Sequence, residues 1–237
     1  MKDDRMLTFS WMKEGWDATL DNIHYILPAV AAFQILAVMP ALLIWKQFDN
    51  RWYALPWEVL IGAPLAVGMN LFYINLVRIG RPDYGDIFRG FTVFPQAVAV
   101  SFLYGLVVTA GTVILVAPGL IWGLSYLFAQ YSVIDKRTGI KGSFVFSSLL
   151  TYGFKERLMP LAMLWVLLEI FTPGIVKAEG TLLQMRLVTD LKPWVLTTFV
   201  LKTLIFLPWL DVVLAKAYIS LVKHHDRQAP PAEPVPS

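Results

Sequence analysis

The chain of 237 residues contains no cysteine and only three histidines. Without cysteine it can form no disulfide, no thiolate nucleophile and no thiolate metal site. Histidine-rich metal centres need several imidazoles around one ion, whereas His24 begins an apolar run and His224 and His225 adjoin a proline-rich tail. The sequence also lacks an HExxH motif, a phosphate-binding glycine loop and a GxSxG motif. These absences predict a protein that is not an enzyme and has no metal or other cofactor.

Charged residues are scarce as well, at 16% of the chain against about 25% in soluble domains, while hydrophobic residues reach 57%. The longest charge-free stretch runs from Ala97 to Ile134, 38 residues without Asp, Glu, Lys, Arg or His. It is far longer than one bilayer crossing, and Ala117-Pro118-Gly119 interrupts it near its middle. The stretch predicts a transmembrane hairpin, and with it an all-α polytopic membrane protein.

Apolar length and flanking charge predict six transmembrane helices. Their expected ranges are His24–Trp45, Leu55–Val77, Gln96–Val116, Gly119–Ile134, Leu158–Ile175 and Trp194–Val222. The fourth is short for a crossing, so a re-entrant segment is the alternative. Six crossings place 14 basic residues on the side of both termini and five on the other side. Because basic residues accumulate on the cytoplasmic side, both termini are expected there, and the net charge of +3 indicates contact with lipid rather than nucleic acid.

Three cytoplasmic segments, residues 1–23, 83–94 and 140–154, have the pattern of amphipathic helices that lie on the membrane. Each precedes a pair of predicted spans and contains a glycine followed by an aromatic residue. The recurrence indicates a three-fold repeat of interfacial helix plus hairpin, although 15 glycines and 33 aromatic residues also produce such dipeptides by chance. The expected organisation is an N-terminal interfacial helix at 1–23, a membrane domain at 24–222 and a disordered, proline-rich tail at 223–237.

Four short segments carry a family resemblance: DIFRGF at 86–91, LVAPGLI at 115–121, YSVID at 131–135 and TYGFKERL at 151–158. Together they resemble six-span bacterial inner-membrane proteins of the YciC-like type, which share a membrane domain with some glycerophosphodiester phosphodiesterases. The resemblance implies six spans in the bacterial cytoplasmic membrane and implies no activity, because the soluble phosphodiesterase domain has no counterpart in this chain. The chain departs from the family at 142–146, where GSFVF replaces a basic, alanine-rich helix.

Ionisable residues inside predicted spans are the remaining functional signal, because a charge in hydrocarbon costs several kcal/mol and usually needs a partner or water. Glu169 and Lys202 lie in the outer halves of neighbouring spans and form a candidate ion pair, either a structural clasp or part of a transport path. Asp211 lies near mid-membrane. Tyr218 shares its helix face, and either Asn70 or Asn75 of the second span can face it. These four residues form a candidate intramembrane polar site, with a buried interhelical hydrogen bond as the alternative.

The sequence favours a non-enzymatic protein of the bacterial inner membrane that binds or supports membrane partners or lipid. Its expected partners are the lipid bilayer and either another membrane protein or a second copy. The alternative is a transporter of a small solute or lipid, in which Asp211, Glu169 and Lys202 line the path. The surroundings of Asp211 separate the two functions, because an accessory role predicts dry packing and transport predicts a polar cavity. Dry packing is the expectation.

Overall fold

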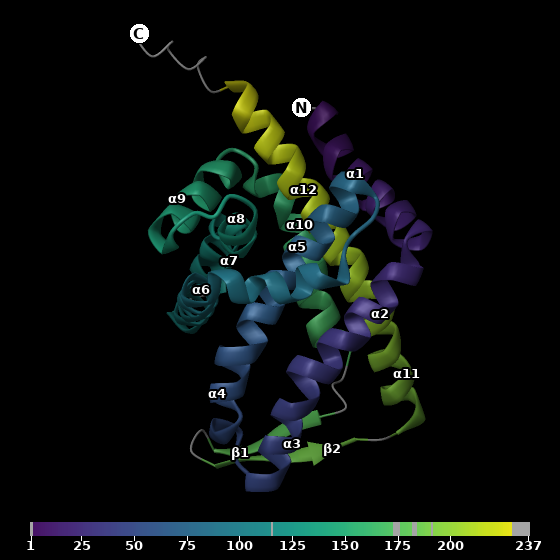
Figure 1. Ribbon diagram of the computed structural model, residues 1–237, viewed down its shortest axis with the longest axis vertical. Coiled ribbons are helices and arrows are strands. Elements are labelled where there is room, and N and C mark those ends of the chain that lie inside the picture. The colour runs from purple at the N-terminus through teal and green to yellow at the C-terminus, as the bar shows by residue number, and fades with distance from the viewer. Residues whose placement is uncertain (1, 115, 173–175, 182–183, 191, 229–237) are drawn as a thin grey trace.

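A computed structural model of the protein describes residues 2–114, 116–172, 176–181, 184–190 and 192–228. Within these ranges the chain is almost entirely helical, as the composition predicts, and one small β-hairpin accompanies the helices (Figure 1). The hairpin joins β1 (Val176–Thr181) to β2 (Gln184–Thr189) in antiparallel register. It lies at one end of the molecule, opposite the start of α1 (Lys2–Asp21) and the end of α12 (Leu207–Gln228).

Four helical stretches are long and apolar enough to cross a membrane, and they cover the first, second, third and sixth predicted spans: Ile23–Phe48, Arg51–Ile79, Tyr84–Val113 and Pro193–Arg227. The first contains α2 (Ile23–Phe33), the π-helix η1 (Gln34–Val38) and α3 (Met39–Phe48). The second contains η2 (Arg51–Tyr53), α4 (Leu55–Trp57), the π-helix η3 (Glu58–Gly62) and α5 (Ala63–Ile79). The third joins the 3-10 helix η4 (Tyr84–Val93) to α6 (Phe94–Ile114). The fourth contains α11 (Pro193–Leu201), the π-helix η5 (Lys202–Phe206) and α12.

The predicted fourth span is shorter than a crossing helix, and the fifth is at the lower limit. The fourth is divided into α7 (Val116–Ser125) and α8 (Ala129–Asp135), of ten and seven residues, where about 20 are needed. α10 (Lys155–Phe171) has 17 residues, at the lower limit for a crossing. Of the six predicted spans, the described residues therefore show four by length and composition.

A serine of α9 (Ile140–Thr151) stabilises the break between α7 and α8. The Ser147 hydroxyl accepts a hydrogen bond from the Phe128 backbone N–H at 3.1 Å and donates to the Ser125 carbonyl oxygen at 2.9 Å. Thr151 donates to the same carbonyl at 3.2 Å. Because the backbone groups freed by the turn find partners on a distant helix, the charge-free stretch can bend where its hydropathy gives no sign of an end.

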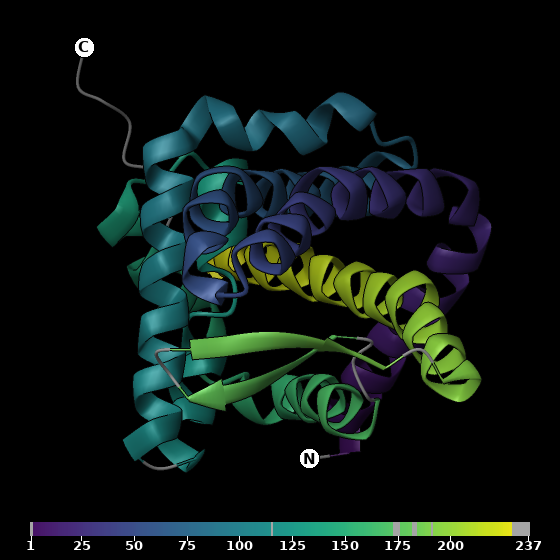
Figure 2. The ribbon, with the colours of Figure 1, turned by 90° about the horizontal axis from the view of Figure 1, so that it is seen from below.

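The α6–α7 hairpin does not run beside the other apolar helices. α6 is seen nearly end-on in Figure 1 and lengthwise in Figure 2, so it crosses the long axis along which α4 and α11 extend. The two helices of the hairpin approach each other closely: a Cβ atom on Gly111 of α6 would lie 2.7 Å from the Cα atom of Gly119 of α7. The sequence correctly predicts a turn in this stretch, but the two arms form a crosswise hairpin instead of two parallel spans.

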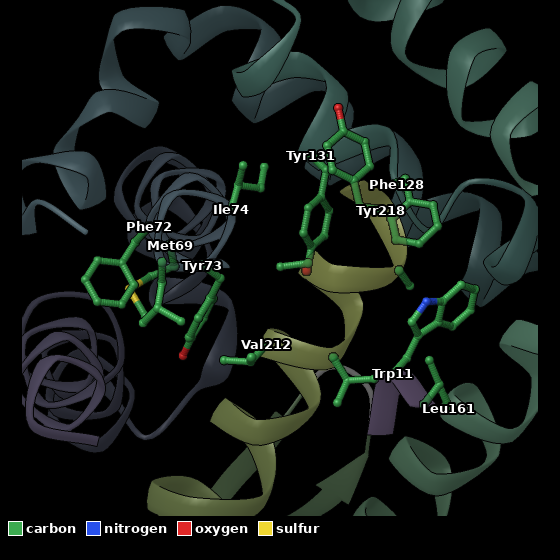
Figure 3. Packing of buried hydrophobic residues seen from close by; sticks show 14 of the residues in the cluster. Trp11, Met69, Phe72, Tyr73, Ile74, Phe128, Tyr131, Leu161, Val212 and Tyr218 are labelled. Atoms are coloured by element: carbon green, nitrogen blue, oxygen red, sulfur yellow. The ribbon is translucent and has the colours of Figure 1, made fainter. Parts of the chain in front are cut away.

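The core lies between α5 and α12, with α1, α8 and α10 around them (Figure 3). Its large side chains include Phe72 and Tyr73 of α5, and the rings of Phe128, Tyr131 and Tyr218, whose centroids lie 5.5–5.7 Å apart. Lipid is as apolar as such a core, so close packing and polar contacts between helices hold a membrane protein together more than the hydrophobic effect does. The polar contacts are therefore the informative part of the structure.

The segments predicted to lie on the membrane differ from one another in the structure. α1 packs on α12, where the Trp209 indole N–H donates to the Met12 carbonyl oxygen at 3.2 Å and its ring lies 5.6 Å from that of Trp16. Trp16 and Leu20 of the predicted membrane face nevertheless stay partly exposed. Residues 84–93 form a 3-10 helix and residues 140–151 an α-helix, so the three-fold repeat is not apparent. α12 continues to Gln228, which makes the first part of the predicted tail helical. Residues 229–237 of that tail lie outside the described residues.

Candidate functional site

A cavity of about 210 Å³ lies between α2, α5 and α12, beside Asp211. Neutral polar residues from four elements line it together with apolar side chains: Gln34, Asn70, Tyr73, Gln130 and Thr203. Figure 3 shows Tyr73 extending from α5 toward α12. The expectation of dry packing around Asp211 is therefore wrong, because helix irregularities next to Asp211 leave room for a polar space.

Asp211 follows Pro208 by three residues on α12, and both line the cavity. In the described part of the chain, no hydrogen bond or ion pair joins its carboxylate to another residue. The two other ionisable residues of the last predicted span are engaged elsewhere, since Lys202 pairs with Glu169 and Lys216 with Glu14. Asp211 is thus a carboxylate that faces a polar space with no basic residue among the lining side chains.

Two hydrogen bonds connect the cavity to α6. The Asn70 side-chain amide donates to Oε1 of Gln130 at 3.4 Å, and Nε2 of Gln130 donates to the Ser101 hydroxyl at 3.1 Å. Of the neutral polar lining residues, Asn70 is predicted from the sequence, whereas Gln34, Tyr73, Gln130 and Thr203 are not. Their signal is an amide or hydroxyl inside an apolar run, and Gln130 is the strongest instance because it stands within the charge-free stretch.

Each π-helical segment of the described chain contributes to a cavity. Gln34 begins η1 and Thr203 belongs to η5, and both line the Asp211 cavity. Glu58 begins η3 and lines a second cavity of about 170 Å³ between the start of the second span and α6. A π-turn widens the helix by one residue and often occurs at functional sites. The coincidence of all three segments with cavity walls points to binding rather than to packing alone.

The structure separates the other two residues of the predicted polar site from Asp211. Asn75 donates from Nδ2 to Oδ2 of Asp86 at 2.7 Å, and the Tyr218 hydroxyl donates to Oδ2 of Asp135 at 3.0 Å. Tyr218 lies two helical turns beyond Asp211, where Asp135 is within reach. Asn75 follows Asn70 by five residues on α5, so it points to a different face. Only Asp211 and Asn70 of the four predicted residues line the cavity.

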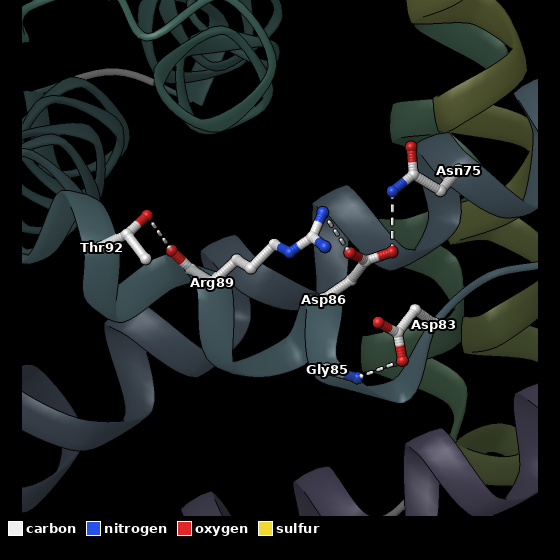
Figure 4. Close-up of polar contacts among 6 residues, drawn as sticks. All are labelled: Asn75, Asp83, Gly85, Asp86, Arg89 and Thr92. Carbon is white, nitrogen blue, oxygen red and sulfur yellow. Dashed lines mark hydrogen bonds and ion pairs between the residues drawn. The ribbon is translucent and has the colours of Figure 1, made fainter.

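The Asp86 cluster explains the segment DIFRGF (Figure 4). Asp86 is 1% exposed, and its Oδ1 lies 2.9 Å from Nη1 of Arg89. Close backbone contact brings Asp86 to Asn75, because a Cβ atom on Gly68 of α5 would lie 1.9 Å from the Ile87 carbonyl oxygen. Gly90 is equally tight against α5. This segment is a docking element of the fold, since its aspartate and glycine contact α5 and its arginine pairs with the aspartate.

The Asp135 cluster gives the segment YSVID a similar role. Asp135 ends α8 and is 6% exposed, and its Oδ1 lies 2.9 Å from Nη1 of Arg78 at the end of α5. Together with the bond from Tyr218, this carboxylate ties α5, α8 and α12 together at the end of the molecule opposite the hairpin. Its buried charge has two partners, which makes it structural.

Glu169 and Lys202 form the ion pair expected from the sequence, with Nζ 2.7 Å from Oε2. The lysine side chain is 12% exposed and that of the glutamate 44%. Neither residue lines the Asp211 cavity. The geometry matches a clasp between α10 and the last apolar helix more closely than it matches part of a path.

Glu169→Ala should lower the free energy of unfolding by about 1–3 kcal/mol, because it leaves the more buried Lys202 without its partner. Exchanging the residues, with Glu169→Lys and Lys202→Glu combined, should recover part of the loss. Thermal unfolding in detergent at low salt measures both. If the double exchange loses as much unfolding free energy as the two single exchanges added together, the clasp is contradicted.

No family model matches the chain, and neither a curated protein nor a solved structure matches it. What the site does must therefore be argued from its own geometry.

Proposed function

We propose that this protein is a non-enzymatic integral membrane protein that binds a small cationic solute at Asp211, as a carrier does. The observation that carries the proposal is a carboxylate without a basic partner beside a polar cavity. An ionised carboxylate in hydrocarbon is costly, so a carboxylate kept there without a partner usually serves an ion or a substrate. Amide and hydroxyl oxygens beside it add neutral ligands suited to a cation.

A purely accessory role is less well supported, because it needs no polar space at Asp211. The structure offers one feature in its favour, a set of exposed apolar side chains on α1, on η4 and just after α9: Trp16, Leu20, Phe88, Phe91 and Tyr152. We assign these side chains to the lipid interface, which they would enter as aromatic and aliphatic anchors. Their partner is then the bilayer.

The proposed membrane orientation follows from charge. Most basic residues outside the apolar helices belong to segments near the termini and residues 78–89 and 136–157, whereas five belong to residues 46–51 and 177–192. Since Lys and Arg accumulate in the cytoplasm, the hairpin end would face outward in a bacterial inner membrane. The six-span architecture of the YciC-like proteins remains a proposal beyond the four stretches described above.

Carbodiimide labelling tests the binding site. Dicyclohexylcarbodiimide reacts with protonated carboxyl groups in apolar surroundings, so mass spectrometry should find it on Asp211 in the purified protein. Sodium, potassium or tetramethylammonium chloride should slow the labelling when the cation occupies the cavity. Asp211→Asn should remove the labelling without lowering the unfolding temperature, because asparagine has the same shape. Labelling of Asp211 as fast in each of the three salts as without added salt would contradict cation binding.

Thiol labelling tests the orientation, and the absence of cysteine makes the background clean. Lys136→Cys should resist an impermeant maleimide added outside intact cells, and Glu179→Cys should react, since both positions are exposed but lie at opposite ends of the molecule. In inside-out vesicles the pattern should reverse. Reaction at position 136 but not 179 in intact cells would invert the proposed topology.

A further inference from the structure

The walls of the two cavities are connected in two places, through neighbouring turns of α5 and through one hydrogen bond. Ala63 lines the cavity that contains Glu58, and Ala66, one helical turn further along α5, lines the cavity that contains Asp211. Ser101 belongs to the first wall and Gln130 to the second, and the two are hydrogen-bonded at 3.1 Å. The Gln130 amide therefore stands where the two spaces would meet.

Both cavities have the same electrostatic character. Each contains one carboxylate, from Glu58 or Asp211, and neither has a lysine, arginine or histidine among its lining residues. Arg51 forms a loose ion pair with Glu58, with Nη2 3.9 Å from Oε2, and because both side chains stay substantially exposed this pair offsets the Glu58 charge only in part. The remaining polar groups are neutral. A route through both spaces would therefore attract cations and repel anions.

The position of Glu58 gives the route a direction. Glu58 begins η3 directly after α4, which lies near the hairpin end in Figure 1. Asp211 lies further inside, on α12 and facing α5. A cation entering from the hairpin end would meet Glu58 first and Asp211 second, with Gln130 between them.

We propose that Gln130 is a gate between two cation-binding cavities, the outer at Glu58 and the inner at Asp211. Its closed position is held by the bond to Ser101 and by the longer 3.4 Å bond from Asn70. The side chain has three rotatable bonds, so it can leave both partners without movement of α8. This inference rests on the proposed function, because it supplies the access route to the Asp211 site.

Cysteine accessibility tests the gate, with Ala63→Cys reporting on the outer cavity and Ala66→Cys on the inner one. The probes are two methanethiosulfonates of similar size, one with a trimethylammonium group and one with a sulfonate, added at the hairpin side of oriented vesicles. Ala63→Cys should react about 10-fold faster with the cationic probe. Ala66→Cys should react slowly until Gln130→Ala is added, which should raise its rate about 10-fold by removing the closed state.

Gln130→Leu is the matched variant, because it keeps the side-chain volume and loses the hydrogen bonds. It should raise the Ala66→Cys rate less than Gln130→Ala does, because leucine still fills the closed position although no hydrogen bond holds it there, and Gln130→Ala should not change the rate at Ala63→Cys. An Ala66→Cys rate that Gln130→Ala leaves unchanged, or that Gln130→Leu raises equally, would overturn the gate. Carbodiimide labelling of Asp211 in the same preparations shows separately whether the binding site itself is present.

Discussion

Gly90→Ala is expected to destabilise the fold by about 3 kcal/mol, with a fall of about 10 °C in the unfolding temperature. A Cβ atom at Gly90 would lie 1.8 Å from the Pro64 carbonyl oxygen and 3.0 Å from the Gly68 backbone nitrogen. These are backbone atoms, so no change of rotamer can relieve the overlap, and η4 would have to leave α5. Circular dichroism during heating in detergent measures the change.

Gly105→Ala is the matched control, because Gly105 belongs to the adjacent helix α6 and a Cβ atom there would meet nothing within 4 Å. Alanine favours the helix by about 1 kcal/mol over glycine, so this variant should unfold at the same temperature as the unchanged protein or slightly higher. If Gly90→Ala and Gly105→Ala unfold at the same temperature, the close contact between η4 and α5 does not contribute to the stability of the fold.

Some of this structure follows from local properties of the sequence. Hydropathy over windows of about 20 residues finds the four apolar stretches, since length and apolarity are what a crossing requires. The Glu169–Lys202 pair is predictable because two opposite charges at similar depth in neighbouring helices can lower their cost only by meeting. Asp211 and Asn70 are predictable for the same reason, as polar side chains at similar depth.

The rest depends on contacts between distant segments. The turn at 126–128 needs Ser147, some 20 residues further along the chain, and η4, from which α6 continues, docks on Gly68 of α5. The π-helical segments change the number of residues per turn within three spans, and therefore which face the following residues present. No local propensity marks these segments. Helix face and depth predict that Asn75 and Tyr218 lie near Asp211, but neither shows that Asp86 and Asp135 reach those helices from other segments.

Asp135→Ala is expected to cost about 3 kcal/mol of unfolding free energy, because it removes the only hydrogen-bond partner assigned to the Tyr218 hydroxyl in the described chain and the carboxylate beside Arg78. Tyr218 is fully buried, so water cannot replace the lost acceptor. Asp135→Asn keeps an acceptor oxygen for Tyr218 and loses only the charge. Thermal unfolding of both variants in detergent measures the difference.

The lost ion pair with Arg78 and the lost hydrogen bond from Tyr218 should contribute unequally to the cost of Asp135→Ala. The Arg78 side chain is 43% exposed, so its ion pair is worth about 1 kcal/mol or less, and Asp135→Asn should cost no more than that. Most of the cost of Asp135→Ala then comes from the orphaned hydroxyl, and adding Tyr218→Phe to Asp135→Ala should recover about 1–2 kcal/mol. If Asp135→Asn costs as much as Asp135→Ala, or if Tyr218→Phe recovers nothing, the charge on Arg78 and not the buried hydrogen bond ties α5, α8 and α12 together.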